Sequence, residues 1–267
     1  MDDVTRPEAR KFKGINWLGV AAIFKREIKR EWRFFGIAMV GPALQTALFA
    51  IVFSVAAAGS VNQMAGLPYI LFLAPGLVMS VGLQRAFEST AYSLMEDKLD
   101  GTLADLLSAP LYALEIMVGQ ALASLILTLL ISASVWAVML PFGIMAPAHP
   151  FWLAGYFLIG VLMFATLGVL AAMISPKWDS LAGKETFIIM PLTFLSGTFF
   201  SIDAVSPSFQ PWLMANPVYH VINGFRHAIT GSINSTHLGG FIYAACVAIA
   251  LWLICSTLYS RGYKLKE

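Results

Sequence analysis

Residues 34–84 read FFGIAMVGPALQTALFAIVFSVAAAGSVNQMAGLPYILFLAPGLVMSVGLQ and contain no Asp, Glu, Lys or Arg. Residues 116–176 form a second stretch that is free of these four residue types. A helix crosses the hydrocarbon core of a bilayer in about 20 residues. Each stretch can therefore hold two membrane-spanning helices joined by a short turn. Only 12% of the 267 residues are charged, against about 25% in soluble domains, which excludes an ordinary soluble fold.

The positive charges are distributed unevenly along the chain. Sixteen of the 17 Lys and Arg residues fall at the N-terminus, around the end of the second predicted span, between spans four and five, or at the C-terminus. Cationic loops stay in the cytoplasm because moving them across a membrane is unfavourable. Both termini are therefore expected to be cytoplasmic, and only Arg226 is expected on the outer side. The basic N-terminus is accordingly interpreted as a topology signal, in preference to a nucleic-acid-binding segment.

We predict an all-α integral membrane protein with six transmembrane helices and both termini cytoplasmic. An N-terminal amphipathic interface helix is expected before the first span, and a re-entrant outer helical segment between spans five and six. No linker or change of composition marks a separate soluble domain. The predicted spans are 37–58, 67–86, 114–140, 152–174, 186–202 and 238–259. The expected segments are a cytoplasmic N-terminus (1–36), one transmembrane domain (37–260) with a cytoplasmic loop (95–110) and the outer segment (203–237), and a cytoplasmic tail (261–267).

The outer segment is predicted from an ambiguous stretch. Residues 209–230 are moderately apolar, but Pro211 and Pro217 interrupt them. A seventh span here would move the basic tail outside and place Arg226 in hydrocarbon, which costs about 2.5–3.5 kcal/mol or more. A re-entrant or outer-surface pair of short helices avoids both problems. Irregular backbone at membrane depth is tolerated only where it packs against protein or lines a cavity.

Residues 15–35 have the pattern of an amphipathic helix. Apolar residues from Trp17 to Phe35 recur at three- and four-residue spacing, and basic residues fill the other side. This pattern is typical of a helix that lies in the membrane interface. The alternative is a plain cytoplasmic extension of the first span, but Gly36 and Gly41-Pro42 offer a place to turn and favour the in-plane helix. The candidate residues of this interface helix are Phe24, Lys25, Ile28, Lys29, Trp32 and Arg33.

The loop at 96–110 also has helical spacing. Thr102 is expected to cap a short helix with Asp105 at the capping-box position, and Pro110 is expected to end it. An apolar face outside the membrane core needs a cover. That cover is either the membrane surface or a groove in a cytoplasmic partner. The residues of this face are Leu99, Leu103, Leu106 and Leu107.

Neutral polar residues mark the interiors of the predicted spans. In the third span they recur every four residues and therefore share one helix face. Such a stripe is more commonly a helix-packing surface, and the alternative is a substrate path. The candidate pathway residues are Gln45, Phe49, Ser80, Gln84, Gln120, Ser124 and Thr128.

The sequence lacks the motifs of several enzyme and carrier classes. Gly183-Lys184 is followed by Glu185 instead of Ser or Thr, so it is not a phosphate-binding loop. No His-Glu-x-x-His or Gly-x-Ser-x-Gly motif is present. No metal site is assigned, because interface hydrogen bonding explains His220 and His227 more simply than a shared metal. The interiors of spans one to four and six have no ionisable residue, which argues against a proton- or sodium-coupled carrier.

Arg226 needs a separate explanation, because it is the only basic residue expected on the outer half. A structural ion pair with Asp203 is favoured, since each is the only counter-charge available to the other on that side. The alternatives are that Arg226 caps helix carbonyls, or that it contacts an anionic head group as substrate leaves.

Three parts of the chain together resemble the ABC-2 type permease family. They are the basic interface helix, the loop DGTLADLLSAP at residues 100–110, and the region that contains PLTFLSGTFF (191–200), Asn216-Pro217 and Gly224-Phe225-Arg226. The family often has Glu where Asp105 stands. The compact size and short outer loops are similar to the bacterial lipooligosaccharide, polysaccharide and drug exporter branch. In such an exporter the outer gate motif would comprise Pro191, Gly197, Asp203, Asn216, Pro217, Phe225 and Arg226.

The resemblance implies a homodimer that carries two copies of a cytoplasmic ABC ATPase. ATP and Mg would bind to the partner ATPase, and this chain would bind no cofactor; membrane lipid is a further partner, and no nucleic acid is expected. The implied function is export of an amphipathic glycolipid, polysaccharide, lipid or drug across a bacterial inner membrane, with Pro75-Gly76 and Pro191 as hinges. The alternatives are an ATP-independent channel or scaffold, and a secondary carrier. The implied ATPase-coupling residues are Asp100, Gly101, Thr102, Leu103, Asp105, Leu106, Leu107 and Pro110.

Overall fold

The computed structural model describes residues 14–33, 35–57, 63–64, 67–143, 146–231 and 235–264. These residues are mostly helical, and the only sheet among them is one antiparallel pair of two-residue strands. Most of the turn expected between the first two predicted spans, and the basic residues before Gly14, lie outside the described residues. The elements are α1 (Trp17–Trp32), α2 (Phe35–Ala57), β1 (Gln63–Met64), β2 (Leu67–Pro68), α3 (Tyr69–Leu99), α4 (Thr102–Ser108), α5 (Ala113–Met139), η1 (Leu140–Phe142), α6 (Pro150–Met173), α7 (Trp178–Lys184), η2 (Glu185–Ile189), α8 (Met190–Phe194), η3 (Ile202–Ala204), α9 (Gln210–Ala215), α10 (Pro217–Thr230) and α11 (Ser235–Ser260).

Five long helices confirm five of the predicted spans. In the described part of the chain, α2, α3, α5, α6 and α11 are long and apolar enough to cross a membrane. The bounds of α2, α5, α6 and α11 lie within a few residues of the prediction; α5, for example, covers Ala113–Met139 where 114–140 was predicted. Pro150 occupies the first turn of α6, where its missing N–H leaves no helical hydrogen bond unmade.

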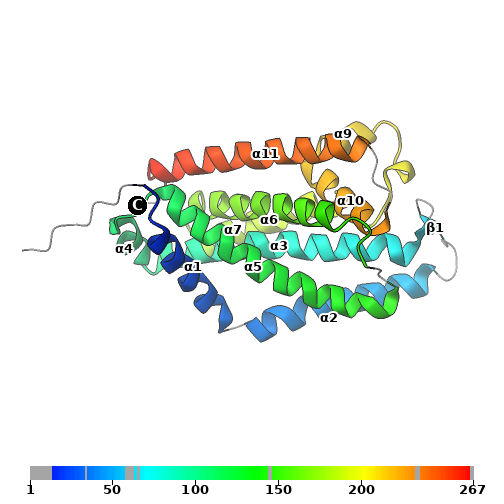
Figure 1. Ribbon diagram of the computed structural model, residues 1–267, viewed down its shortest axis with the longest axis horizontal. Helices are drawn as coiled ribbons and strands as arrows, with labels where there is room; N and C mark the ends of the chain where they lie inside the picture. The colour runs from blue at the N-terminus through cyan, green and yellow to red at the C-terminus, as the bar shows by residue number, and fades with distance from the viewer. Residues whose placement is uncertain are drawn as a thin grey trace, which may run out of the picture.

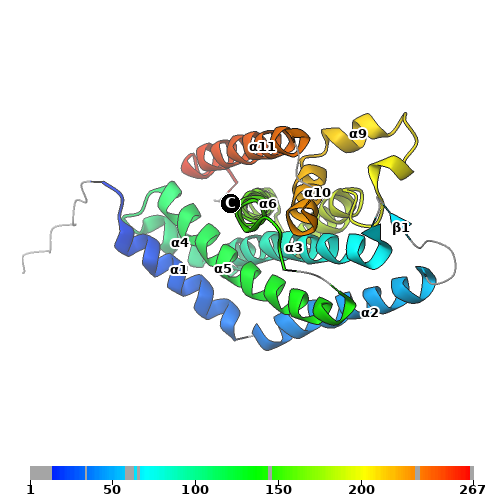
Figure 2. The ribbon, with the colours of Figure 1, turned by 45° about the vertical axis from the view of Figure 1, so that its right-hand side comes forward.

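Helix α3 lies at the centre of the bundle and is longer than predicted (Figures 1 and 2). Its 31 residues span about 46 Å, whereas a bilayer core is about 30 Å thick. More than three helical turns therefore continue beyond residue 86, where the span was predicted to end. Hydropathy falls there because of Arg85 and Glu88, but these two side chains pair with each other at 3.2 Å on the helix surface and do not interrupt it.

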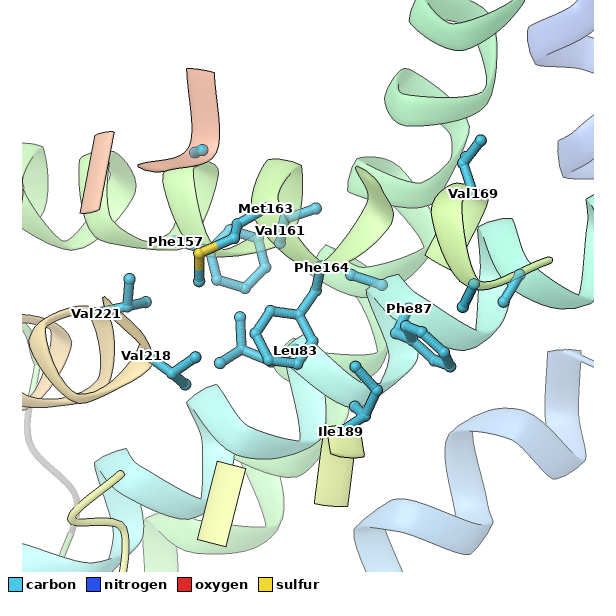
Figure 3. Close-up of a cluster of buried hydrophobic side chains, with 14 of the residues drawn as sticks. Leu83, Phe87, Phe157, Val161, Met163, Phe164, Val169, Ile189, Val218 and Val221 are labelled. Carbon is cyan, nitrogen blue, oxygen red and sulfur yellow. The ribbon is translucent and has the colours of Figure 1, made fainter. Parts of the chain in front are cut away.

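The core lies where α3 crosses α6, and Gly168 allows the two helices to approach closely. A Cβ atom at Gly168 would lie 2.3 Å from Thr90 Oγ1 and 2.4 Å from the Phe87 carbonyl oxygen. Thr90 Oγ1 also donates to the Ala165 carbonyl at 2.7 Å, which ties the two helices together. Figure 3 shows the surrounding apolar side chains, among them Leu83, Phe87, Phe157, Phe164, Val218 and Val221.

The fifth predicted span, 186–202, is not one continuous helix. Helices α7, η2 and α8 follow one another without a break from Trp178 to Phe194, and η2 is a π-helical turn. The chain then leaves the helix, and Gly197 adopts a left-handed conformation with φ of 72°. Pro191 has no N–H to donate to the preceding turn, which accounts for the irregular hydrogen bonding in this region.

Different helices and strands lie at the two ends of the bundle. Helices α1 and α4 lie at the same end as the C-terminal end of α11, and β1 and α9 lie at the opposite end (Figure 1). Helix α1 confirms the amphipathic helix predicted at 15–35, with Asn16 as its N-cap. The end that holds α1 and α4 is called the basal end below.

Candidate functional site

Helix α4 confirms a helix in the predicted loop but corrects the role of its leucines. Leu103 and Leu106 are only 3% and 7% exposed and belong to the core of this chain. The expectation that both need a membrane or a partner as cover is therefore wrong. Gly101, with a left-handed φ of 76°, turns the chain so that α4 packs back against α3. Leu107 is half-buried, and Leu99 stays exposed.

The exposed surface around α4 is polar and acidic. Asp100, Ala104, Asp105 and Ser108 are exposed, and so is Pro110 just beyond the helix. A partner that docks here would meet two carboxylates and small side chains. The leucines would contribute to such a surface mainly by holding α4 in place.

Thr102 does not cap α4. The N-cap is Gly101, which has no side chain to offer. The Thr102 hydroxyl instead lies 3.1 Å from Asp97 Oδ1 and donates to it. The capping-box prediction is wrong because a buried carboxylate of α3 is within reach of this hydroxyl.

Asp97 lies at the centre of an ionic cluster that joins α1 to the basal end of α3. It is 2% exposed, accepts a hydrogen bond from Arg26 Nη2 at 2.8 Å, and accepts another from Arg30 Nη2 at 2.7 Å. The buried Glu27 pairs with Arg26 at 2.6 Å and accepts from Ser93 Oγ at 2.6 Å. We call this group the basal clamp; its members are Arg26, Glu27, Arg30, Ser93, Asp97 and Thr102.

Electrostatics at the basal clamp favour the charged state of Arg26. Burial alone would lower the pKa of Arg26, but the nearby Glu27 and Asp97 carboxylates outweigh it and leave that pKa raised. Further along α1, burial raises the pKa of the Glu31 carboxyl although Glu31 contacts Arg85. Arg85 thus links the last turn of α1 to the middle of α3.

The first turn of α1 is attached to α5. The Asn16 side chain accepts from Gly19 N at 3.0 Å, and Asn16 N donates to Glu115 Oε1 at 2.6 Å. The second oxygen of Glu115 accepts from Tyr112 N at 2.8 Å. Helix α1 is therefore fixed at its first turn to α5 and in its second half to α3.

Helix α1 has three faces, of which sequence reasoning found two. Val20, Ile23 and Glu27 form the missed face, which is buried against the bundle. A Glu among arginines is the usual pattern of a solvated surface, so nothing in the sequence marked this face as buried. Trp17 and Trp32 of the predicted apolar face stay 66% and 60% exposed, as expected for side chains that meet a membrane. Among the other predicted residues, Phe24 and Ile28 are half-buried, and Lys25, Lys29 and Arg33 are exposed.

Arg226 lies buried at the end of the bundle opposite the basal clamp. Its Nε donates to the Phe72 carbonyl at 2.9 Å and its Nη2 to the Gly197 carbonyl at 2.7 Å. The guanidinium carbon lies 3.7 Å from the centre of the Phe72 ring. Asp203 is exposed and makes no ion pair with Arg226 among the described residues. The predicted pair is therefore wrong, and the carbonyl-capping alternative is confirmed.

Arg226 finds its carbonyl partners at two irregular backbone segments. Pro75 has no N–H to donate to the Leu71 carbonyl, so the helical hydrogen bonding of α3 is interrupted next to Phe72. Gly197 follows the last turn of α8, where carbonyls have no helical partner. Gly76 makes room for the guanidinium, since a Cβ there would lie 2.9 Å from Arg226 Nη2 and 3.0 Å from the Thr198 carbonyl oxygen.

Asn216 and Pro217 begin α10 and tie it to α8. Asn216 Oδ1 accepts from Val218 N at 3.0 Å, and its Nδ2 donates to the Leu192 carbonyl of α8 at 3.2 Å and to Ser196 Oγ at 2.9 Å. The structure therefore gathers Pro191, Gly197, Asn216, Pro217 and Arg226 around the end of α8. Two other members of the predicted gate motif lie apart: Phe225 packs in the core against Trp136 and Phe157, and Asp203 lies in η3 on the surface.

Three candidate pathway residues are buried inside the bundle. Gln120, Ser124 and Thr128 of α5 are at most 2% exposed. Ser124 Oγ donates to the Ala86 carbonyl of α3 at 3.2 Å. This contact supports the helix-packing interpretation of the polar stripe and not the pathway interpretation.

The other four candidate pathway residues lie on α2 and α3. Ser80 Oγ is 2.8 Å from Thr198 Oγ1, and Gln84 Nε2 is 3.5 Å from Thr193 Oγ1. On α2, Gln45 is exposed, and the Phe49 ring lies 6.4 Å from the Phe199 ring. Three residues after Pro191 that sequence reasoning had not assigned complete this arrangement: Thr193, Thr198 and Phe199. Their place in the PLTFLSGTFF segment was the available signal.

The histidines that share a helix face have different neighbours. His220 Nε2 lies 2.7 Å from the Met214 carbonyl oxygen, which agrees with a hydrogen-bonding role. The His227 ring lies 4.2 Å from the ring of His237 on α11. These contacts give no support to a metal shared by His220 and His227.

Apolar helices of spanning length with an amphipathic helix at their base are the features of a multispanning membrane protein. Residues 19–230 match the ABC-2 type transporter family, and the chain belongs to this family. It is the membrane permease component of an inner-membrane transporter and not its ATPase.

Relatives with known names cover nearly the whole chain. The inner membrane transport permease YadH of Escherichia coli K12 is 27% identical over 252 residues, which is 94% of this chain and 98% of YadH. Nodulation protein J of Rhizobium leguminosarum bv. viciae is 24% identical over 259 residues, 93% of this chain and 95% of that protein. Nodulation protein J of Sinorhizobium fredii is 26% identical over 219 residues, 80% of this chain and 81% of its own length.

Proposed function

We propose that this chain is the transmembrane subunit of an ATP-driven exporter that moves an amphipathic substrate out across the inner membrane. Two copies would form a homodimer, and two copies of a cytoplasmic ABC ATPase would dock on it and bind ATP and Mg. The observation that carries the proposal is the basal clamp. Asp97 of α3 bonds to α1 through Arg26 and Arg30 and to α4 through Thr102. A push on α4 therefore reaches α1 and α3 together.

The proposed topology has six spans with both termini in the cytoplasm. Five spans are the long helices, and the sixth is the broken unit α7–η2–α8. The residues that follow it, up to α10, would form a re-entrant outer segment. The buried bonds of Arg226 support this placement, because a charged residue at membrane depth must be paired or must bond to backbone carbonyls.

The proposed ATPase contact is the acidic surface of α4. Asp100 and Asp105 are exposed there, whereas Leu103 and Leu106 are not available to a partner. Charge complementarity would then orient the ATPase, since charged groups at an interface set register and association rate. The Leu99 side chain adds one exposed apolar contact.

The proposed homodimer contact involves α2 and the broken fifth span. Leu48 and Val52 of α2 are exposed, and Phe187 of η2 is 80% exposed. An apolar cavity of about 670 Å³ is lined in part by Phe187, Pro191 and Trp212. The substrate path would run between the two copies past Gln45, Phe49, Ser80 and Gln84, because these residues border the same region. The exposed apolar faces suit an amphipathic substrate and do not select among glycolipid, polysaccharide, lipid and drug.

Reversing the charge of the α4 surface tests the proposal. The variant Asp100→Lys with Asp105→Lys should lose co-purification with the ATPase and ATP-dependent export, while its folding is unchanged. Asp179→Lys is the matched control, because Asp179 is an exposed carboxylate on a different helix, α7. Unchanged co-purification and export in the double variant would remove the support for coupling through α4.

The alternative functions predict different requirements. An ATP-independent channel would pass substrate in vesicles that contain this chain alone. A secondary carrier would need an ion gradient and no nucleotide. Export that requires both the ATPase and ATP, and is unaffected by ionophores, is the result expected here.

A further inference from the structure

A cavity of about 380 Å³ lies between α1, α2, α3 and α7. It is at the basal end, beside the first turn of the α2 span. One wall is apolar and is formed by Ile37 and Ala38 of α2. The other walls carry charged, polar and aromatic side chains: Arg30, Glu31, Arg85, Tyr92, Ser93, Glu96 and Trp178.

The cationic side chains of this cavity already have partners. Arg85 contacts Glu31 and pairs with Glu88 at 3.2 Å. Arg30 is held by Asp97 at 2.7 Å and by the Ser93 carbonyl at 2.9 Å. An incoming anion would have to displace these contacts, so the cavity is poorly suited to a phosphate or carboxylate ligand.

The Glu96 carboxylate, in contrast, remains accessible. The Glu96 side chain is 52% exposed, and its contact with Arg30 Nε is 3.6 Å long. Tyr92 OH donates to Glu185 Oε2 at 2.8 Å, which brings another carboxylate next to the cavity. The rings of Tyr92 and Trp178 stand edge to face with centroids 5.7 Å apart. Aromatic faces beside carboxylates are the surroundings that ammonium groups prefer.

We propose that this cavity binds the ammonium head group of an amphiphile whose apolar part lies along α2. The ammonium would pair with Glu96 and lie against the Trp178 and Tyr92 rings. The apolar part would extend past Ile37 and Ala38 into the membrane. The head group could come from an aminated lipid or from a soluble amine. Under the proposed topology the site faces the inner leaflet, but binding itself requires neither the ATPase nor ATP.

The test measures binding to the full-length chain alone in phosphatidylglycerol nanodiscs. A bimane fluorophore is attached at Gly41→Cys, one helical turn from the cavity, where a Cβ meets no atom within 4 Å. Cys246 and Cys255 are replaced first. Two quenchers are called the cationic probes after their ammonium groups: zwitterionic phosphatidylcholine with a nitroxide on its ammonium, and water-soluble trimethylammonium nitroxide. The third quencher is an uncharged nitroxide. Saturable quenching by either cationic probe, and only linear quenching by the uncharged one, is expected.

The two cationic probes distinguish the sources of the head group. Saturable quenching by the lipid probe identifies a lipid head group, and saturation by the soluble probe alone identifies a small amine. Each result supports the inference. If neither cationic probe saturates, the inference is overturned, whereas the proposed exporter function is unaffected because it is tested through α4.

Two variants locate the binding within the cavity. Glu96→Gln and Trp178→Leu should each lower the affinity for the saturating probe by roughly 2- to 30-fold, the range expected for one charge or one cation–π contact. Both side chains are partly exposed, so neither change removes buried packing. Asp179→Asn, which removes an exposed carboxylate next to Trp178 but outside the lining, should leave binding unchanged. Equal affinity in Glu96→Gln, Trp178→Leu and the control would also overturn the assignment.

Discussion

Replacing Asp97 with Asn should detach α1 and α4 from α3 while the rest of the bundle stays folded. The change keeps the shape of the side chain but removes the charge that Arg26 and Arg30 share. Breaking a buried ion pair destabilises a protein by about 3–5 kcal/mol. The arginine side chains here are 31% and 25% exposed, so water replaces part of the loss, and we expect about 2–3 kcal/mol.

Hydrogen exchange measures this local detachment directly. A loss of about 2–3 kcal/mol corresponds to roughly 30- to 150-fold faster exchange of amides that open with the clamp. The increase should appear in the second half of α1 and in α4, because Thr102 also loses its acceptor. Amides of α6 should exchange at their original rates.

The control for this prediction is Asp100→Asn, three residues further along the chain. Asp100 is exposed and forms no ion pair among the described residues, so its exchange pattern should match the unmodified chain. Arg30→Ala should loosen the same amides, and combining it with Asp97→Asn should add less than the sum of the two effects. Equal exchange in the Asp97 and Asp100 variants would refute the claim that Asp97 joins the three helices.

Three further predictions concern the rest of the fold. Arg226→Ala should sharply lower the yield of monodisperse protein in size-exclusion chromatography, since it removes charge-assisted hydrogen bonds of about 1.5–3 kcal/mol each. Asp203→Ala should have no effect on that yield, alone or in combination, and a rescue of the Arg226 variant by the Asp203 change would contradict the carbonyl-capping geometry. Gly76→Val should lower the melting temperature in detergent, because its branched side chain would overlap the guanidinium; an unchanged temperature would show that the contact is not close. In a background without Cys246 and Cys255, an impermeant thiol reagent added outside should label a cysteine at Ser208 and not one at Asp100, and the reverse pattern would disprove the proposed topology.

The long helices could be predicted because a bilayer imposes a length on any apolar segment. Where a clear signal marks the boundary of a helix, as Pro150 does at the start of α6, the predicted and observed bounds differ by only a few residues. The end of α3 was predicted too early, because the prediction followed hydropathy alone. Hydropathy reports where a helix becomes polar, but a helix continues for as long as its backbone hydrogen bonds and packing persist.

The orientation of amphipathic faces was harder to predict. Leu103 and Leu106 were correctly recognised as one face, but the periodicity does not say what covers it. Gly101 provides the turn that folds this face onto α3, and a left-handed glycine between two helices is not visible in the spacing of leucines. Likewise, Glu27 lies among basic residues and Asp97 in a charged Glu-Asp-Lys run, so both look solvated until the two helices are placed side by side.

The sequence predicted a structural role for Arg226 but favoured the wrong partner. Asp203 was favoured as the partner of Arg226 because a sequence shows which side chains are charged but does not show which backbone carbonyls can accept a hydrogen bond. The Gly197 carbonyl lies beyond the end of α8, and the Phe72 carbonyl lies one residue after the Leu71 carbonyl, which Pro75 leaves without its helical donor. Helix-breaking residues near a lone buried cation are therefore a better guide to its partners than the nearest opposite charge.

The length of α3 has a mechanical consequence. Phe72, which accepts a hydrogen bond from Arg226, and Asp97, which holds the clamp, lie on this one helix about 38 Å apart. A helix of that reach acts as a lever: a tilt of roughly 4° about its basal end displaces the far carbonyl by nearly 3 Å. The bond between Arg226 Nε and Phe72 is itself 2.9 Å long, so a tilt of this size is enough to break it. The strength of the basal clamp at one end of α3 therefore limits how far the opposite end of the helix can move.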